Sequence, residues 1–172
     1  NNLNKLKLTY AHEMQGEPDL SAAINKLQPS ILIGVSGQGA TFIESVIRMM
    51  GEINERPIIF ALSNPTSKSE CTAEQAYNWT EGRAIFASGS PFDSVTYGQN
   101  TFYPGQGNNA YIFPGVGLGV VISKSSRVTD DMFISAADTL ANMVSEEDLA
   151  KGRLYPSLAK IRDISCDIAV NV

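Results

Sequence analysis

Residues 31–40 read ILIGVSGQGA, an apolar run that ends abruptly in a polar, glycine-containing turn. The apolar residues at 31–35 follow one another without alternation, which is typical of a strand covered on both faces, as in a parallel sheet. After the turn, Thr41 and Glu44 have the spacing of a capping box, and apolar residues recur at helical intervals. The stretch therefore predicts a strand, a glycine turn and a helix capped by Thr41.

The same unit recurs twice along the chain. Residues 58–62 (IIFAL) lead into a Ser-Asn-Pro-Thr turn at 63–66, and 83–87 (RAIFA) lead into a Ser-Gly-Ser-Pro turn at 88–91. Strands that alternate with helices predict a parallel α/β sheet with right-handed crossovers. In such sheets ligands bind beyond the carboxyl ends of the strands. The serine, glycine and amide residues of these turns suit a site that approaches its ligand with backbone and carboxamide groups.

The regions flanking these units carry weaker patterns. Leu6 and Leu8 alternate with polar residues, which favours an edge strand near the start of the chain. Residues 18–27 begin with Pro-Asp and space their apolar residues for one buried helix face. Thr72 and Gln75 are spaced to cap a short helix between the second and third strands.

A polar stretch with special backbone requirements follows the third strand. Residues 93–103 predict a loop or hairpin with its tip at 97–100, and residues 105–109 (GQGNN) form a turn before an apolar segment. Glycine lets the backbone pass close to another group, and two adjacent carboxamides offer both donors and acceptors. The stretch is therefore either a capped turn or a means of aiming Asn108 and Asn109 into a cleft.

After residue 109 the pattern predicts only helices, over about 110–123 and 130–144, from 146, and from 157 onward. The first of them contains three glycines, at 115, 117 and 119. Each costs roughly 1 kcal/mol relative to alanine in a helix, so we expect another backbone to approach closely there. The change of pattern near 109 marks the expected domain boundary.

Composition excludes several classes of protein. With 172 residues, 43% hydrophobic and 18% charged, the chain has the size and composition of one globular domain. A net charge of −5 argues against nonspecific binding to nucleic acid, and no apolar run is long enough to span a bilayer. Two distant cysteines favour reduced thiols, in the cytoplasm or a mitochondrial matrix. His12 is the only histidine and is expected at the surface, so no histidine-based catalytic triad is available.

Six stretches, which occur in the family's order, together resemble the C-terminal half of malic enzymes, those of animals above all. They are residues 33–37 (IGVSG), 54–66 (NERPIIFALSNPT), 70–74 (ECTAE), 86–92 (FASGSPF), 104–109 (PGQGNN) and 152–156 (GRLYP). The resemblance implies the second half of a Rossmann-like parallel-sheet domain over 1–108. It implies a helical segment over 109–172 that returns to the substrate and catalytic domain.

Activity and site residues are also implied by the resemblance. The family oxidises malate with NADP or NAD and a Mg or Mn ion, and then decarboxylates the product to pyruvate and CO2. Residues implied to contact malate are Asn64, Asn108 and Asn109; those implied to contact the cofactor are Lys7, Val35, Ser36, Gly37, Ser63, Asn64 and Asn109. Residues 7–13 (KLTYAHE) resemble the NADP-preferring animal enzymes, in which a lysine at the position of Lys7 can pair with the 2′-phosphate.

The resemblance assigns no catalytic residue and no metal ligand to these residues. The family's acid/base pair, metal ligands, malate-binding arginine and first glycine-rich turn belong upstream of Asn1. We therefore expect an inactive fragment that needs its upstream half, within a dimeric or tetrameric enzyme. Two alternatives stay open: a non-enzymatic α/β module that binds a ligand or partner, and another NAD(P) oxidoreductase, against which the Ser-Asn-Pro turn followed by the two-asparagine turn argues.

Overall fold

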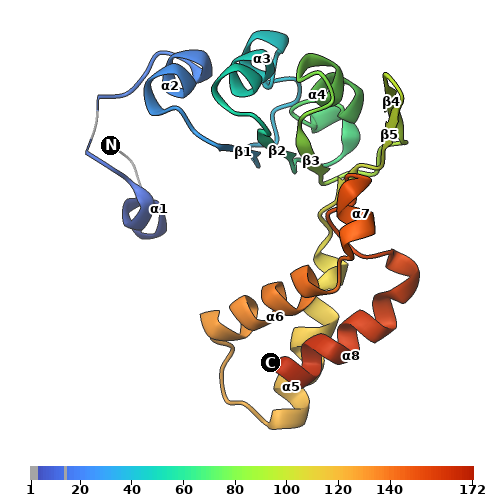
Figure 1. Cartoon of the computed structure of the whole chain (residues 1–172). Coiled ribbons are helices and arrows are strands. Elements are labelled where there is room, and N and C mark those ends of the chain that lie inside the picture. Colours follow the sequence, from blue (N-terminus) through green and yellow to red (C-terminus); the bar gives the residue numbers. More distant parts are fainter. Residues whose placement is uncertain (1–3, 14) are drawn as a thin grey trace.

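The computed structural model describes residues 4–13 and 15–172, and Figure 1 shows a sheet with helices on one side and a separate group of helices below it. The strands are β1 (Ile31–Gly34), β2 (Ile58–Ala61), β3 (Ile85–Ser88), β4 (Val95–Tyr97), β5 (Asn100–Phe102) and β6 (Gly105–Gln106). The α-helices are α1 (Lys5–Tyr10), α2 (Leu20–Leu27), α3 (Glu44–Ile53), α4 (Ala73–Trp79), α5 (Phe113–Ser123), α6 (Asp130–Asn142), α7 (Glu146–Ala150) and α8 (Ile161–Asn171). Short 3-10 helices are η1 (Thr66–Lys68), η2 (Asn109–Tyr111) and η3 (Leu158–Lys160).

The main sheet has the order β1-β2-β3-β6, and all of its strands are parallel. The predicted parallel α/β class and the three predicted strands are thus confirmed. Gly34 pairs with Ala61, Ala61 with Ser88, and Ser88 with Gln106, so the four strands end level with one another. The polar turns that follow the strands therefore meet along one edge of the sheet.

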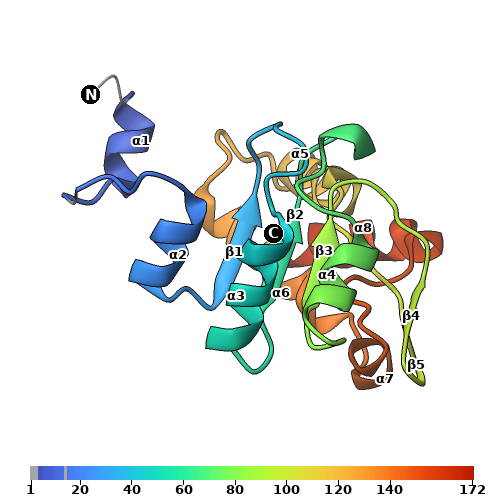
Figure 2. The same ribbon diagram turned by 90° about the horizontal axis from the view of Figure 1, so that it is seen from above.

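Helices α2, α3 and α4 cover a single face of this sheet (Figures 1 and 2). The core between them is apolar, and Ile47, Met50 and Ile59 are fully buried in it. The opposite face is open at β1, where Ile31 is 49% and Ile33 54% exposed. The unbroken apolar run predicted burial on both faces. That expectation is wrong for β1 within the described residues, because α5, α6 and α8 pack chiefly on one another.

The hairpin predicted over 93–103 is present as the antiparallel pair β4 and β5, and Gly98 takes a φ of 61° at its tip. It packs against α4, where the ring of Phe102 stacks on that of Tyr77 with 4.6 Å between centroids. The capping box of Thr72 and Gln75 is also confirmed at the start of α4.

Two predictions near the start of the chain are wrong. Leu6 and Leu8 lie in the helix α1, which the side chain of Asn4 caps by accepting from the backbone N–H of Lys7 at 2.9 Å. Thr41 does not cap α3, because its hydroxyl donates to the carbonyl of Gln38 at 3.3 Å. Helix α3 begins only at Glu44, with no side-chain cap.

The second half is mostly helical and has its own apolar core. Helix α5 crosses α8, and the predicted close approach is confirmed at two of its three glycines. A Cβ at Gly115 would lie 2.6 Å from the Cβ of Ile168, and one at Gly119 would lie 3.0 Å from the carbonyl oxygen of Ala169. At Gly117 a Cβ would meet nothing within 4 Å.

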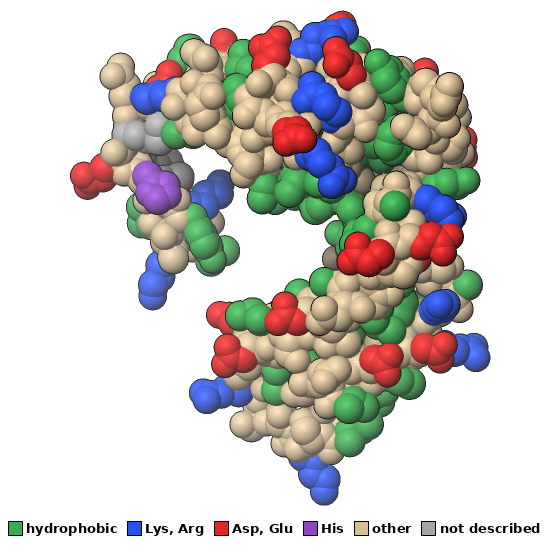
Figure 3. All heavy atoms as spheres, in the orientation of Figure 1, with side chains coloured by type: hydrophobic (Ala, Val, Ile, Leu, Met, Phe, Trp, Pro, Cys, Tyr) green, Lys and Arg blue, Asp and Glu red, His purple; other side chains and the backbone are tan. Residues whose placement is uncertain are grey.

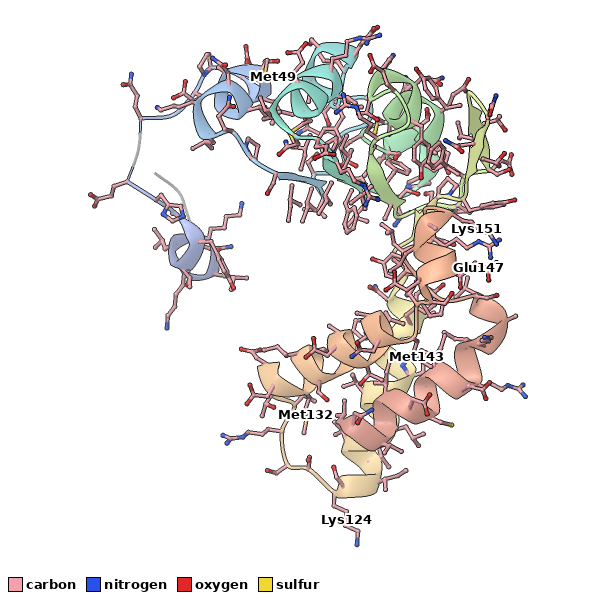
Figure 4. All side chains as sticks on the ribbon, in the orientation of Figure 1. Met49, Lys124, Met132, Met143, Glu147 and Lys151 are labelled. Carbon is pink, nitrogen blue, oxygen red and sulfur yellow. The ribbon has the colours of Figure 1, made fainter. Side chains whose placement is uncertain are left out.

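A narrow segment around α7 joins the two parts. Glu147 of α7 and Lys151, which directly follows the helix, form an ion pair on the outer side of the molecule (Figure 4). The carbonyl of Lys151 accepts from the backbone N–H of Tyr103 at 3.0 Å, which ties the helix to the end of the hairpin. None of the helices in residues 4–13 and 15–172 combines the length and apolar character needed to cross a membrane.

Candidate functional site

Four turns form the carboxyl edge of the sheet, and they enclose a pocket of about 370 Å³. Its lining comes from all four turns: Val35, Leu62, Asn64, Gly89, Gly107, Asn108 and Asn109. Every one of these residues is uncharged, so the pocket offers a ligand hydrogen bonds and apolar contact but no opposite charge.

The first turn, after β1, contributes a backbone wall. Val35 is 73% exposed at the pocket, and Gly37 takes a φ of 70°, a conformation that a side chain would strain. The backbone N–H of Gly37 donates to the hydroxyl of Ser63 at 2.9 Å. The hydroxyl of Ser36 is used locally, since it accepts from the N–H of Gln38 at 3.3 Å.

The second and third turns are joined by a hydrogen bond between Asn64 and Ser90. The hydroxyl of Ser90 donates to Oδ1 of Asn64 at 2.8 Å. Nδ2 of Asn64 makes a long hydrogen bond of 3.5 Å to the carbonyl of Leu62, and its second N–H has no partner among the described residues. The backbone at Gly89 passes so close to Asn64 that an added Cβ would lie 2.6 Å from Nδ2. A glycine is therefore required at position 89 for the two turns to meet.

The fourth turn carries the two adjacent carboxamides. Oδ1 of Asn108 accepts from the N–H of Ala110 at 2.8 Å, so Asn108 also presents N–H donors. The side chain of Asn109 has no hydrogen-bond partner among residues 4–13 and 15–172, and it is exposed at the pocket. The turn is held against β3 by the N–H of Gly107, which donates to the carbonyl of Ser88 at 2.8 Å.

Behind the carboxamides, an apolar hollow of about 550 Å³ shares four lining residues with the pocket: Leu62, Gly107, Asn108 and Asn109. Two stacked tyrosines, Tyr111 and Tyr155, line it with 5.4 Å between ring centroids. Burial raises the pKa of both phenols, and for Tyr111 the neighbouring Tyr155 raises it further. Both phenols therefore stay protonated at neutral pH, and that of Tyr111 donates to the carbonyl of Pro156 at 2.6 Å.

The structure brings together most of the site residues that the sequence suggested. Val35, Asn64, Asn108 and Asn109 line one pocket, and the remaining members of the first two turns, Ser36, Gly37 and Ser63, lie directly beside it. Lys7 is not among them, because it lies exposed on α1, which stands apart from the sheet beyond α2 (Figures 1 and 2).

The sequence placed the Ser-Gly-Ser-Pro turn at the ligand edge of the sheet, but it assigned no individual role to Leu62, Gly89, Ser90 or Gly107. Leu62 reads as the last residue of an apolar strand, and the roles of Gly89 and Ser90 depend on contacts with Asn64 across 25 and more residues of chain. The position of Gly89 in a turn at a strand's carboxyl end was the one signal available.

A metal centre has no candidate ligands in the described parts of the chain, since no group of three or more His, Cys, Asp or Glu residues is placed to hold an ion. The pocket is a candidate for the nicotinamide end of a dinucleotide. Its amide donors, the unpartnered Asn109 and the closely approached glycine backbone match a flat ring that carries a carboxamide.

Comparisons with known proteins agree with this geometry. The model of the family described as "Malic enzyme, NAD binding domain" matches residues 1–172. The chain is 54% identical over 170 residues to "NADP-dependent malic enzyme 3" of Arabidopsis thaliana and 56% identical to "NADP-dependent malic enzyme" of Populus trichocarpa. In each case the match covers 99% of this chain and 29% of the relative.

A third relative, "NADP-dependent malic enzyme, chloroplastic" of Oryza sativa subsp. japonica, is 54% identical over 99% of this chain and 27% of its own length. These relatives come from plants, so they do not support the expected likeness to the animal enzymes. From the match over all 172 residues and the pocket at the carboxyl edge of the sheet, we conclude that the chain belongs to the malic enzyme family and represents its NAD-binding domain.

Proposed function

We propose that this chain forms the nicotinamide end of the cofactor site in an enzyme that oxidises malate with NADP and decarboxylates the product to pyruvate and CO2. The observation that carries the proposal is the state of two carboxamides. Asn64 and Asn108 line one pocket, and each has Oδ1 engaged by a protein donor at 2.8 Å. Apart from a 3.5 Å bond from Asn64 to the carbonyl of Leu62, their N–H groups have no partner among the described residues. Paired donors suit a substrate rich in carboxylate and carbonyl oxygens.

The pocket residues are proposed to contact different parts of the two ligands. Asn64 and Asn108 donate to oxygens of malate, and Asn109, which has both a free donor and a free acceptor, also binds the carboxamide of the nicotinamide. Val35, Ser36 and Gly37 form a wall beside the ring, and Ser63 holds that wall by accepting from the Gly37 N–H. When bound, NADP supplies the hydride acceptor.

NADP is preferred over NAD in this proposal, and Lys7 pairs with the 2′-phosphate. The relatives quoted above are named as NADP-dependent, which supports the preference. The 2′-phosphate belongs to the adenosine ribose, at the far end of the dinucleotide from the nicotinamide. The separation of Lys7 from the pocket is therefore compatible with its proposed role.

The acid, the base and the Mg or Mn ligands are proposed to come from outside these residues. The chain spans about 29% of the length of the relatives it matches, and its pocket contains no ionisable side chain. Residues 1–108 then provide the second half of the cofactor domain, and 109–172 lead back to the substrate and catalytic domain. The whole enzyme is proposed to be a dimer or tetramer.

Two free thiols support a reducing compartment such as the cytoplasm. Cys71 is buried and Cys166 exposed, and neither is in a disulfide. Burial, together with the charge of the adjacent Glu70, raises the pKa of the Cys71 thiol to about 12, so Cys71 stays protonated and unreactive.

The test is an assay of the whole protein with malate, Mn²⁺ and either cofactor, followed by NADPH or NADH absorbance and pyruvate release. We expect reduction of the cofactor only when malate is present, one pyruvate per cofactor reduced, and a higher kcat/KM for NADP than for NAD. Cofactor binding without malate-dependent reduction would contradict the proposed activity. An equal or higher kcat/KM for NAD would contradict the preference.

A further inference from the structure

Glu70 is a buried carboxylate just below the pocket, and the proposed function gives it no role. Its side chain is 1% exposed. None of the ion pairs in the described part of the chain involves it. A buried charge without a cation is costly unless hydrogen bonds satisfy it. The hydrogen-bond donors to Glu70 therefore indicate its role in the structure.

Both of its oxygens accept from one residue, Ser63. Oε2 accepts from the Ser63 backbone N–H at 3.3 Å, and Oε1 accepts from the Ser63 hydroxyl. The hydroxyl has one proton, which goes to Glu70, so its oxygen is free to accept. It does so from the N–H of Gly37 at 2.9 Å. The carboxylate thus fixes the orientation of the Ser63 hydroxyl. We call the resulting chain of hydrogen bonds, in which Gly37 donates to Ser63 and Ser63 donates to Glu70, the relay.

The backbone around Glu70 holds the same two turns together a second time. The carbonyl of Glu70 accepts from the N–H of Phe42, and that of Ser69 from the N–H of Ala40, each at 3.0 Å. The end of β1 leaves space for the carboxylate, because a Cβ at Gly34 would lie 2.8 Å from Oε1 and 2.5 Å from Cγ. Glu70 therefore links the turn after β1 to the turn after β2, from beneath.

We propose that Glu70 is a positioning residue for the cofactor site: through Ser63 and Gly37 it sets the separation of Val35 and Asn64 across the pocket. Val35 comes two residues before Gly37, and Asn64 directly follows Ser63. The backbone bonds to Ser69 and Glu70 hold the first turn at Ala40 and Phe42, whereas at Gly37, next to the pocket, the bond to Ser63 holds it. Loss of the carboxylate leaves Ser63 free to turn and the first turn free to shift, which changes the shape offered to the nicotinamide.

This inference rests on the proposed cofactor site, and the test uses the whole protein with variants Glu70→Gln, Ser63→Ala and the double variant. Glutamine keeps the shape of the side chain but has one acceptor oxygen for two donors. We expect each single variant to raise the Kd of NADPH about three- to tenfold, the size of effect from one hydrogen bond. The double variant should be no weaker than the weaker single, because both changes break one relay.

Glu52→Gln is the matched control, since Glu52 is exposed on α3 and forms no ion pair in the described residues. Its Kd should equal that of the unsubstituted protein. If Glu70→Gln does not fold, Glu70→Asp replaces it, because aspartate keeps the charge but is too short to reach both Ser63 donors. The same non-additivity with Ser63→Ala is then expected.

A lower Tm with an unchanged Kd in the Glu70 variant would show a role in stability alone and would overturn the proposal. Additive effects in the double variant would overturn it as well. NADPH binding is measured without malate, so its outcome is independent of turnover. A protein that binds NADPH but does not oxidise malate would contradict the proposed activity and would leave the test of Glu70 valid.

Discussion

The amide oxygens of Asn64 and Asn108 are occupied before any ligand arrives, and this makes the two residues specific in a way that a free asparagine is not. A free carboxamide can donate or accept, so it discriminates little between ligands. Ser90 and the backbone N–H of Ala110 bias that choice toward donation, because each takes up part of the acceptor capacity of one amide oxygen. The pocket therefore prefers ligands that bring acceptors, such as carboxylates and carbonyls.

Replacing Asn64 or Asn109 by alanine in the whole enzyme should leave a bound polar group without its partner. We expect kcat/KM for malate to fall by a factor equivalent to about 1–3 kcal/mol. A fall in kcat would show that the amide acts mainly in the transition state, and a rise in KM alone would show equal binding of both states. Asn78→Ala, in an exposed residue of α4, is the control. Unchanged kinetics in both pocket variants would remove these residues from the site.

Lys7→Gln should distinguish the two cofactors. The lysine charge can pair with the 2′-phosphate, which NAD lacks, so we expect KM for NADP to rise about three- to tenfold while KM for NAD stays the same. Lys5→Gln, two residues earlier in the exposed helix α1, provides a matched loss of charge. Equal effects on both cofactors, or an equal effect of the Lys5 variant, would count against the pairing.

Much of the pocket could be predicted because its residues directly follow apolar strands. Val35 and Asn64 follow β1 and β2, and the rule that parallel strands end together places them side by side. Glu70 could not be found in this way. A glutamate in a polar stretch is expected at the surface. Glu70 is buried because Gly34, 36 residues earlier, has no side chain and leaves space for the carboxylate.

Helix α5 offers a direct test of why it contains so many glycines. Gly115 and Gly117 have the same residue type in the same helix but different surroundings, since only Gly115 faces α8. Gly115→Ala should destabilise the protein by about 1–3 kcal/mol, because the new methyl group meets Ile168 and the carbonyl of Ser165. Gly117→Ala should stabilise it by up to about 1 kcal/mol, since alanine is the better helix former.

Urea unfolding followed by circular dichroism measures both changes. The essential result is that the two variants change the free energy of unfolding in opposite directions. Both carry the same substitution in the same helix, so other effects of the substitution are largely the same. Destabilisation by both variants to the same extent would show that the contact with α8 does not explain Gly115.

Elements were predictable where one local pattern decided them. The three long strands have unbroken apolar runs, and α4 has its complete capping box. Strand β6 was missed because its two residues, Gly105 and Gln106, have no apolar pattern and become a strand only by pairing with β3. The start of α3 was misplaced because Thr41 is held in the preceding turn by its bond to Gln38.

The open face of the sheet is an apolar surface that no described element covers at β1. Figure 3 shows hydrophobic side chains gathered on the side of the sheet that faces the helical group. Ile31, Ile33 and Val35 are all about half exposed or more, at 49%, 54% and 73%, and β1 has no neighbour on its outer side among the described residues. Exposed apolar surface and an unpaired strand edge both favour association.

The 172 residues by themselves should catalyse nothing. Malate oxidation needs a base for the hydroxyl proton and an acid for the enolate, and no side chain of the pocket can serve as either. The measurement is NADPH formation from malate and NADP with Mn²⁺, on the purified chain and on the whole enzyme at equal molar concentration. Turnover by the chain alone would show that the acid, base and metal ligands lie within it.

The side chain of Glu70 fills the space that a side chain at residue 34 would occupy, so the residues allowed at these two positions in the family depend on each other. A mutation that enlarges residue 34 would displace the carboxylate, and a mutation that shortens residue 70 would leave a void beneath β1 and free Ser63. Either change is harmful alone, and the two become compatible only when they occur together. We therefore expect the pair to evolve as a unit: lineages that lose the glycine should also have lost the glutamate, and should hold the Ser-Asn-Pro turn by some other contact.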